Sequence, residues 1–321
     1  MHYDDDAPPR NFSPLPSQTP CVPGLVTERL LGIGGRSSVW LVRQGPSVAP
    51  TITWAGENPP RTLALKVPLG ALRTAPPLRS AQRELEAMLP LMHQYLVRPW
   101  GVVRTSDGQP GLLLQPFTAG SLAQLRRAVG VLNAGECVTA VSPIAQALAH
   151  LHESGAAHGD VTAANILLTP EGRPALGDLG DSVLLGMDSA HGTPESDVKS
   201  LAAVAWSCLT GREPESVDRR PPLQSLVPGV SDQFAELLEA ALSATPSQRP
   251  LAGEFAADLH ECASPEPLDI LSAADDHALT EVPTVIPQMR LSSPGRSAWK
   301  CLIRRLRILV RGPARRRVPA H

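Results

Sequence analysis

Three polar residues near the middle of the chain have the types and the spacing that phosphoryl transfer requires. Asp160 and Asn165 lie in the run from His158 to Leu168, and Asp178 follows ten residues after that run. Phosphoryl transfer asks little covalent chemistry of a protein. One carboxylate orients the attacking hydroxyl, and oxygen or amide ligands hold a divalent cation on the phosphates. The pattern therefore predicts a site for a nucleotide and a divalent metal ion.

The segments on either side would have to carry these residues into place. Residues 144–153 have the periodicity of an amphipathic helix that leads into His158, and residues 166–168 read as a short apolar strand. Earlier in the chain, residues 30–42 read as strand, glycine turn and strand. Glycines in such a turn let the backbone approach a phosphate closely. A second β-rich run, residues 62–67, follows after a Pro-rich loop.

Lys66 in this second run is one of only three lysines among 29 basic residues. Because lysine is so rare here, we interpret Lys66 as a residue kept for its chemistry rather than as a solubilising lysine on an edge strand. The segment from Ser80 to Met92 has an apolar face with helical spacing. Glu84 and Glu86 lie on different faces of this predicted helix, so only one of them can face Lys66. The helical pattern alone leaves open which of the two it is.

The order and spacing of these motifs resemble the eukaryotic-type (Hanks-type) serine/threonine protein kinases of bacteria over residues 24–262. The resemblance implies catalytic roles for Asp160, which would orient the substrate hydroxyl, and for Lys66, paired with Glu84. It also implies that Asn165 and Asp178 hold Mg²⁺ or Mn²⁺. The nucleotide-binding residues that it implies are Gly32, Ile33, Gly34, Val39, Ala64, Lys66, Leu114, Gln115, Phe117 and Leu167.

Within that set, residues 112–122 resemble the hinge that clasps adenine. The adenine edge would meet Gln115 C=O and Phe117 N–H, and Pro116, which has no N–H, falls between the two positions used. Leu114 would guard the back of the adenine site and Leu167 would form its floor.

The resemblance predicts an α+β, two-lobed fold with a small β-rich N-lobe, a larger helical C-lobe and disordered termini. We expect a Pro-rich disordered segment at residues 1–23 and a protein kinase domain at 24–263, divided into an N-lobe at 24–116 and a C-lobe at 117–263. A linker is expected at 264–298 and a basic amphipathic tail at 299–321. The preference for arginine over lysine, together with 34 prolines, suggests a bacterial, GC-rich genome.

A related family competes for the same catalytic motif. Aminoglycoside and choline kinases carry a similar His-Gly-Asp loop, so phosphorylation of a small molecule is an alternative. Two later features favour a protein kinase. Residues 196–214 resemble the buried central helix of the large lobe and its exit, and residues 244–250 resemble the late Arg-Pro motif.

The chain departs from the protein kinase pattern at several positions. Ser37 replaces the third glycine of the phosphate loop, and Leu179 replaces a phenylalanine. Gly159 replaces the arginine that normally reads a phosphate on the activation loop, which disfavours switching by loop phosphorylation. Thr162 stands where a lysine normally contacts the transferred phosphate, and losing one such contact should slow transfer.

The interval from Asp178 to Asp197 is a larger departure, because only 19 residues lie where the family places the activation segment and the peptide-docking platform. Thr193-Pro194-Glu195 resembles a remnant of the motif that ends this segment, with Glu195 pairing Arg249. We therefore expect a serine/threonine protein kinase of weak activity that acts on an unknown protein or mainly on itself. The main alternative is a pseudokinase, an ATP-binding scaffold that signals through its conformation.

Charge is distributed unevenly along the chain. Residues 290–321 hold ten basic residues and no acidic one, which leaves 19 basic against 31 acidic residues elsewhere. Residues 299–317 alternate apolar and basic faces, which suggests an anionic membrane surface or an acidic partner. Nucleic acid is disfavoured because no folded basic module accompanies the tail. Scattered cysteines and the lack of a long apolar run predict a cytoplasmic protein, with peripheral attachment to the inner membrane as an option.

Overall fold

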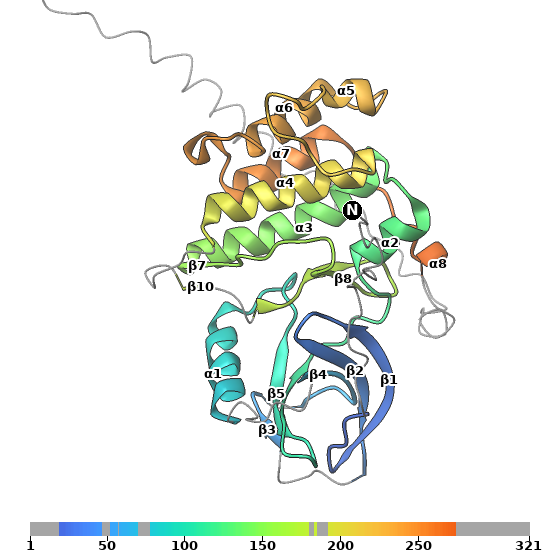
Figure 1. Cartoon of the computed structure of the whole chain (residues 1–321), viewed down its shortest axis with the longest axis vertical. Coiled ribbons are helices and arrows are strands. Elements are labelled where there is room, and N and C mark those ends of the chain that lie inside the picture. The colour runs from blue at the N-terminus through green and yellow to red at the C-terminus, as the bar shows by residue number, and fades with distance from the viewer. Residues whose placement is uncertain are drawn as a thin grey trace, which may run out of the picture. The chain divides into compact units, whose positions relative to one another are not determined.

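The computed structural model describes residues 19–46, 52–56, 58–69, 78–179, 183–184 and 192–273. The basic tail and most of the two expected disordered ends lie outside these residues. The described residues form a small β-rich lobe and a larger helical lobe, as the sequence predicts (Figure 1).

The small lobe is built on a six-stranded antiparallel sheet in the order β1-β2-β4-β6-β5-β3. Strand β4 lies inside this sheet, where Lys66 is opposite Val39 of β2 on one side and Leu112 of β6 on the other. Helix α1 lies beside the sheet (Figure 1). The strands are β1 (Leu25–Ile33), β2 (Ser37–Gln44), β3 (Ile52–Trp54), β4 (Thr62–Pro68), β5 (Pro99–Arg104) and β6 (Pro110–Leu114), and α1 is Leu78–Met88.

One strand of this sheet corrects the sequence-based expectation. The Pro-rich segment before Lys66 was expected to be only a loop, but its residues Ile52–Trp54 form β3, which pairs antiparallel with β5 at the edge of the sheet. Ile-Thr-Trp is a run of β-branched and aromatic residues that fits a pleated, half-buried surface. The prolines on both sides concealed this short strand from a reading of composition.

The large lobe is a stack of helices around α3 and α4, whose side chains are mostly buried. Helix α3 packs against α7 and α4. One of two small antiparallel ladders lies near the C-terminal end of α3, and the other lies between α3 and the small lobe (Figure 1). The helices are α2 (Leu122–Val129), α3 (Ala134–Glu153), α4 (Pro194–Thr210), α5 (Leu223–Leu226), α6 (Asp232–Ala241), α7 (Ala252–Cys262) and α8 (Ile270–Ala273). The ladders pair β7 (Ala156–Ala157) with β10 (Val183–Leu184) and β8 (Ile166–Leu168) with β9 (Pro174–Leu176), and 3₁₀ turns lie at η1 (Leu89–Leu91) and η3 (Pro246–Gln248).

The folded part of the chain extends ten residues beyond the predicted boundary at residue 263. Residues 263–273, called here the C-terminal strap, run from the end of α7 to α2. Leu268 and Ile270 in the strap are buried in the main core, and Thr139 of α3 donates a hydrogen bond to the Glu266 carbonyl at 2.6 Å. Residues 264–273, expected to be part of a linker, are therefore packed against α2 and the large lobe through these two apolar side chains.

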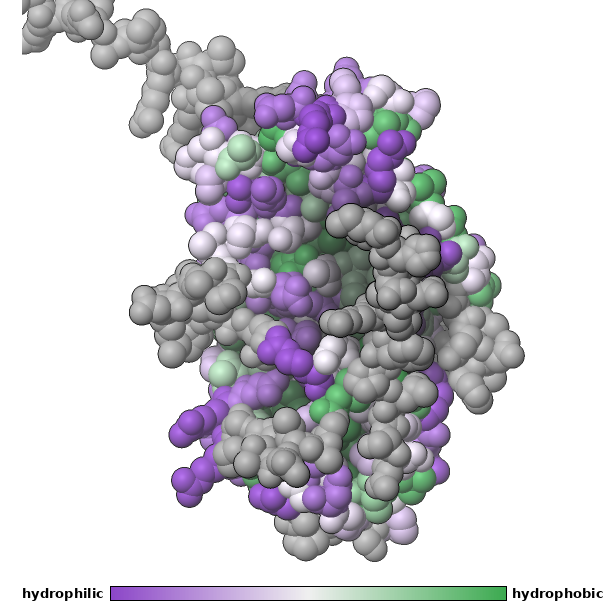
Figure 2. All heavy atoms as spheres, in the orientation of Figure 1, coloured by the Kyte–Doolittle hydropathy of each residue, from purple (hydrophilic) through white to green (hydrophobic). Residues whose placement is uncertain are grey.

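The surface of the described residues carries no broad apolar face in the view shown. Figure 2 shows hydrophilic and hydrophobic residues interspersed over both lobes. The large apolar side chains that are exposed come from separate segments, and scattered residues of this kind are normal for a folded domain. They are Val26, Met92, Val131, Val217, Leu251 and Leu271. No helix in the described part of the chain combines the length and the apolarity that crossing a bilayer requires.

Candidate active site

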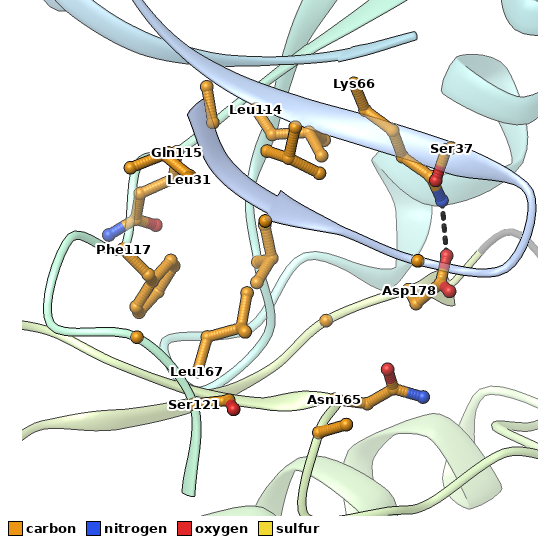
Figure 3. Close-up of a pocket in the computed structure, with 18 of the residues that line it drawn as sticks. Leu31, Ser37, Lys66, Leu114, Gln115, Phe117, Ser121, Asn165, Leu167 and Asp178 are labelled. Carbon is orange, nitrogen blue, oxygen red and sulfur yellow. Dashed lines mark hydrogen bonds and ion pairs between the residues drawn. The ribbon is translucent and has the colours of Figure 1, made fainter. Parts of the chain in front are cut away.

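A cavity of about 350 Å³ is lined by residues from both lobes and holds nearly all of the predicted site residues. Its volume lies in the range typical of small-molecule sites. All ten residues predicted to bind the nucleotide line it, together with Glu84, Asn165 and Asp178 (Figure 3). The predicted residues thus converge on one cavity although they come from segments far apart in the sequence.

Lys66 and Asp178 approach one another across this cavity. Lys66 Nζ donates a hydrogen bond to Asp178 Oδ1, and the two form an ion pair between β4 and the loop after β9 (Figure 3). The charges remain partly exposed, with side-chain accessibilities of 23% and 41%. Glu84 on α1 lines the same cavity, but its pairing with Lys66 stays a prediction.

The backbone at Asp178 adopts a conformation that ordinary residues avoid. Its φ angle is 62°, in the left-handed region, and it is one of two non-glycine residues with positive φ among those described. Such a conformation costs of order 1–3 kcal/mol and is commonly found at functional sites, where surrounding structure enforces it. The backbone N–H of the preceding residue, Gly177, donates to the Asn165 carbonyl at 2.8 Å. This bond fixes the strained residue beside Asn165.

Asn165 connects the cavity to Asp160. Its side-chain nitrogen donates to the Asp160 carbonyl at 2.8 Å and to Asp160 Oδ2 at 3.0 Å. Asp160 is not a lining residue of the cavity and lies one hydrogen bond beyond it. This arrangement leaves the Asn165 amide oxygen and an Asp178 carboxylate oxygen as hard donors suited to magnesium. No group of three or more His, Cys, Asp or Glu residues gathers among the described residues, this site included, so a cation held by Asn165 and Asp178 would need water or phosphate to complete its coordination.

Asp197 holds the loop that carries Asp160, a role that the sequence analysis did not assign. Its carboxylate is 1% exposed and accepts from His158 N at 2.7 Å, Gly159 N at 2.8 Å and His152 Nε2 at 3.0 Å. The available signal was an acidic residue in the first turn of an otherwise apolar helix. Such a carboxylate becomes buried with the helix and must find donors there.

His158 connects the loop that carries Asp160 to the loop that carries Asp178. Its side chain is fully buried, as expected for a packed histidine, and its Nε2 donates to the Gly177 carbonyl at 2.9 Å. Its Nδ1 accepts a longer bond from Asp160 N at 3.3 Å. His158 thereby fixes the spacing between the Asp160 loop and the Asp178 loop.

The segment after α1 supports the Asp178 loop from the other side. Leu176 N donates to the Tyr95 carbonyl at 2.8 Å, and Val97 N donates to the Leu176 carbonyl at 2.9 Å. His93 in this segment stacks on His150 of α3, with ring centroids 5.1 Å apart. Burial, and secondarily the neighbouring His150, lower the pKa of His93 below its usual value. The contact therefore favours the neutral form of His93.

The structure gives a physical reason for glycine at position 159. Gly159 has φ 79°, and a Cβ atom on Gly192 would lie 2.8 Å from the Gly159 Cα. Gly192 thus passes directly over the loop that carries Asp160, backbone against backbone. Arg249, expected to pair with the Glu195 carboxylate, instead donates to the Glu195 carbonyl at 2.9 Å. The segment is therefore anchored through its backbone.

The cavity residues to which the sequence analysis gave no role include Ser121, Gln124 and Arg127, which lie at the N-cap of α2 and within it. Ser121 and Gln124 form a capping box in which Ser121 N donates to Gln124 Oε1 at 2.7 Å. The Ser-x-x-Gln pattern before an apolar run was a usable signal for the helix start. It gave no indication that this helix would border the cavity.

The sequence of this chain is similar to those of known protein kinases. The family model for the protein kinase domain matches residues 61–198. A probable serine/threonine-protein kinase of Dictyostelium discoideum is 28% identical over 210 residues, which are 56% of this chain and 42% of that protein. Serine/threonine-protein kinase PknH of Mycobacterium tuberculosis is 25% identical over 301 residues, 81% of this chain and 46% of the relative. PknK of the same organism is 30% identical over 202 residues, 52% of this chain and 18% of the relative. The chain spans less than half the length of each of these relatives.

Proposed function

Because the chain belongs to the family of eukaryotic-type (Hanks-type) bacterial serine/threonine protein kinases, we propose that it transfers the γ-phosphate of ATP to a serine or threonine hydroxyl. The observation that carries this proposal is the single cavity shared by Lys66, Asn165 and Asp178, with Asp160 bonded to Asn165. The left-handed backbone of Asp178 supports the proposal, because backbone strain of this kind is commonly found at functional sites.

The residues divide the work of the reaction in space. Apolar side chains of Val39, Ala64, Leu114 and Leu167 would enclose the adenine, and the glycines of the β1–β2 turn would lie over the phosphates. Lys66 would leave Asp178 for the α- and β-phosphates when the nucleotide enters. Asp160 would orient the attacking hydroxyl and accept its proton, because its carboxylate lies beside Asn165 at the metal-binding end.

Asn165 and Asp178 would hold a magnesium ion, which would supply positive charge to neutralise the phosphates. Thr162 supplies no cation next to this position. Since the loss of one donor that stabilises transition-state charge typically costs about 10²–10³ in rate, we expect slow transfer. The short interval after Asp178 offers little platform for a foreign peptide, so we propose that the chain phosphorylates itself more readily than other proteins.

The test measures transfer of radiolabelled phosphate from ATP with Mg²⁺ and, separately, with Mn²⁺. Wild type should incorporate label, and Asp160→Asn and Asp178→Asn should not. Asp232→Asn removes an exposed carboxylate on α6, outside the cavity, and serves as the control that should behave as wild type. Label in both site variants at the wild-type level would show that the transfer does not use this site.

A second candidate, an ATP-binding scaffold without transfer activity, is favoured by Thr162 and the short segment. It predicts that ATP raises the melting temperature of wild type although no label is incorporated under any condition. Absence of both label and thermal shift would contradict both candidates.

For residues 299–317 we propose binding to an anionic membrane surface, on the basis of their alternating apolar and basic residues. The test is co-sedimentation with vesicles that contain anionic lipid, and it compares the full chain with residues 1–290. Equal sedimentation of the two proteins would remove this proposal.

A further inference from the structure

The mouth of the cavity carries one basic residue that the phosphoryl-transfer reaction does not use. Arg127 lies on α2, lines the cavity and is exposed to solvent. It therefore borders the opening rather than the enclosed adenine end. A substrate that approaches this opening would meet the Arg127 side chain.

Helix α2 carries Arg127 beside the loop that holds Asn165. Ala123 N, in the first turn of α2, donates to the Ala163 carbonyl at 2.9 Å, which fixes this helix face against the loop that holds Asn165. Arg127 lies four residues further along, on the same face, and its Nε donates to the Ala123 carbonyl at 3.2 Å. Ala123, Arg127 and Ala164 all line the cavity.

The charge of Arg127 is not compensated by its surroundings. No carboxylate among the described residues lies within ion-pair distance of it, whereas Lys66 is already paired with Asp178 across the cavity. Ser121 and Gln124 are uncharged and engaged with each other in the capping box. The preceding Arg126 is turned elsewhere, with Nη1 donating to Ser207 Oγ at 2.9 Å. Arg127 is thus the charge that α2 presents at the opening.

We propose that Arg127 is a specificity-determining residue that selects substrates in which the reacting hydroxyl is flanked by an anionic side chain. This inference rests on the proposed kinase activity and adds the substrate class. The guanidinium can bind a carboxylate or a phosphorylated residue through two parallel hydrogen bonds, a geometry that a substrate with basic flanks does not offer. A serine or threonine with an aspartate, a glutamate or a phosphoresidue nearby would gain binding energy at this position.

The experiment measures phosphorylation of serine peptides that differ only in their flanking residues: acidic, phosphorylated, neutral or basic. Because the site is open to solvent, we expect wild type to prefer the acidic over the neutral peptide by only about two- to fivefold. Arg127→Glu should reverse the order and favour the basic peptide. Arg212→Glu makes the same change in net charge at an exposed position beyond α4 and should keep the wild-type order. The acidic and phosphorylated peptides separate the two sources of the anion.

A binding measurement keeps this inference separate from the activity itself. Fluorescence anisotropy with alanine-for-serine versions of the same peptides, in the presence of magnesium and a non-hydrolysable ATP analogue, reports recognition without transfer. If wild type phosphorylates no peptide but binds the acidic one through Arg127, the specificity inference stands and the proposed activity fails. If wild type phosphorylates peptides with the same preference as Arg127→Glu, the activity stands and the inference is overturned. A loss of ATP-analogue affinity in Arg127→Ala without any change in peptide order would also overturn it, because the residue would then serve the nucleotide.

Discussion

Removal of the charge on Asp197 is predicted to disable the catalytic loop while leaving the nucleotide cavity formed. The two carboxylate oxygens accept three hydrogen bonds, with Oδ1 serving Gly159 N and Oδ2 serving His158 N and His152 Nε2. In Asp197→Asn one of these oxygens becomes an NH₂ group. That group donates and cannot accept, so at least one buried donor is left facing another donor.

The structure gives the size of the effect. An unsatisfied buried donor costs about 1–3 kcal/mol, so Asp197→Asn should lower the free energy of unfolding by that amount. Asp197→Ala removes all three bonds and leaves each donor without this acceptor, so the loss of stability should be larger than in Asp197→Asn. The larger consequence concerns chemistry, because Gly159 adjoins Asp160. A shift of about 1 Å in a reacting group can cost roughly 10²-fold in rate.

The assay combines equilibrium unfolding in urea with transfer of radiolabelled phosphate and ATP-analogue binding. Both Asp197 variants should be less stable and should transfer phosphate far more slowly, while nucleotide affinity changes little because Asp197 does not line the cavity. Glu236→Gln removes an exposed charge from α6 and is the matched control. Wild-type stability and wild-type transfer in Asp197→Asn would refute the reasoning that this carboxylate holds the loop.

Three further predictions concern close packing and protonation. Gly192→Ala should slow transfer more than it lowers stability, because the new Cβ would lie 2.8 Å from the Gly159 Cα and push on the catalytic loop. Gly135→Ala should lower the free energy of unfolding by about 1–3 kcal/mol, since its Cβ would lie 2.5 Å from a carbonyl oxygen of the C-terminal strap. Burial and the adjacent His150 lower the pKa of His93, so the unfolded chain binds more protons there and stability should fall as the pH drops below the usual value of 6.5.

Each of these predictions has a matched control. Gly56→Ala adds a Cβ with no atom within 4 Å, and wild-type transfer is expected. Gly253→Ala lies inside helix α7 with its nearest neighbour at 3.7 Å, so it should stabilise slightly through helix propensity. If Gly135→Ala is as stable as Gly253→Ala in urea, the strap is not held as described. For the pH effect, urea unfolding between pH 5.5 and 7.5, a range that brackets the ordinary histidine pKa, compares wild type with His93→Gln. Equal slopes in the two proteins would contradict the role of His93.

Local patterns in the sequence predicted most of the elements and supplied candidate site residues, nearly all of which the structure gathers around one cavity. The glycine turn before Val39, the rare Lys66 in a β-rich run, and the spacing from Asp160 to Asp178 are all short-range signals. They succeed because strands, helix faces and turns depend on residues that are close in the chain. The short strand β3 and the C-terminal strap were missed for the opposite reason. Their stability comes from partners that are distant in sequence, namely β5 for the strand and α2 for the strap.

What the sequence by itself determined is the chemistry available to this protein: which carboxylates, amide and lysine it possesses and which segments carry them. Only the tertiary structure decided how those groups are held. The burial of Asp197 under the Asp160 loop, the backbone contact of Gly159 with Gly192 and the hydrogen bond that holds α2 beside that loop all join segments that are apart in the chain. Residue type sets what an atom can donate or accept, but burial and distance decide which partner it meets, and both exist only once the chain is packed.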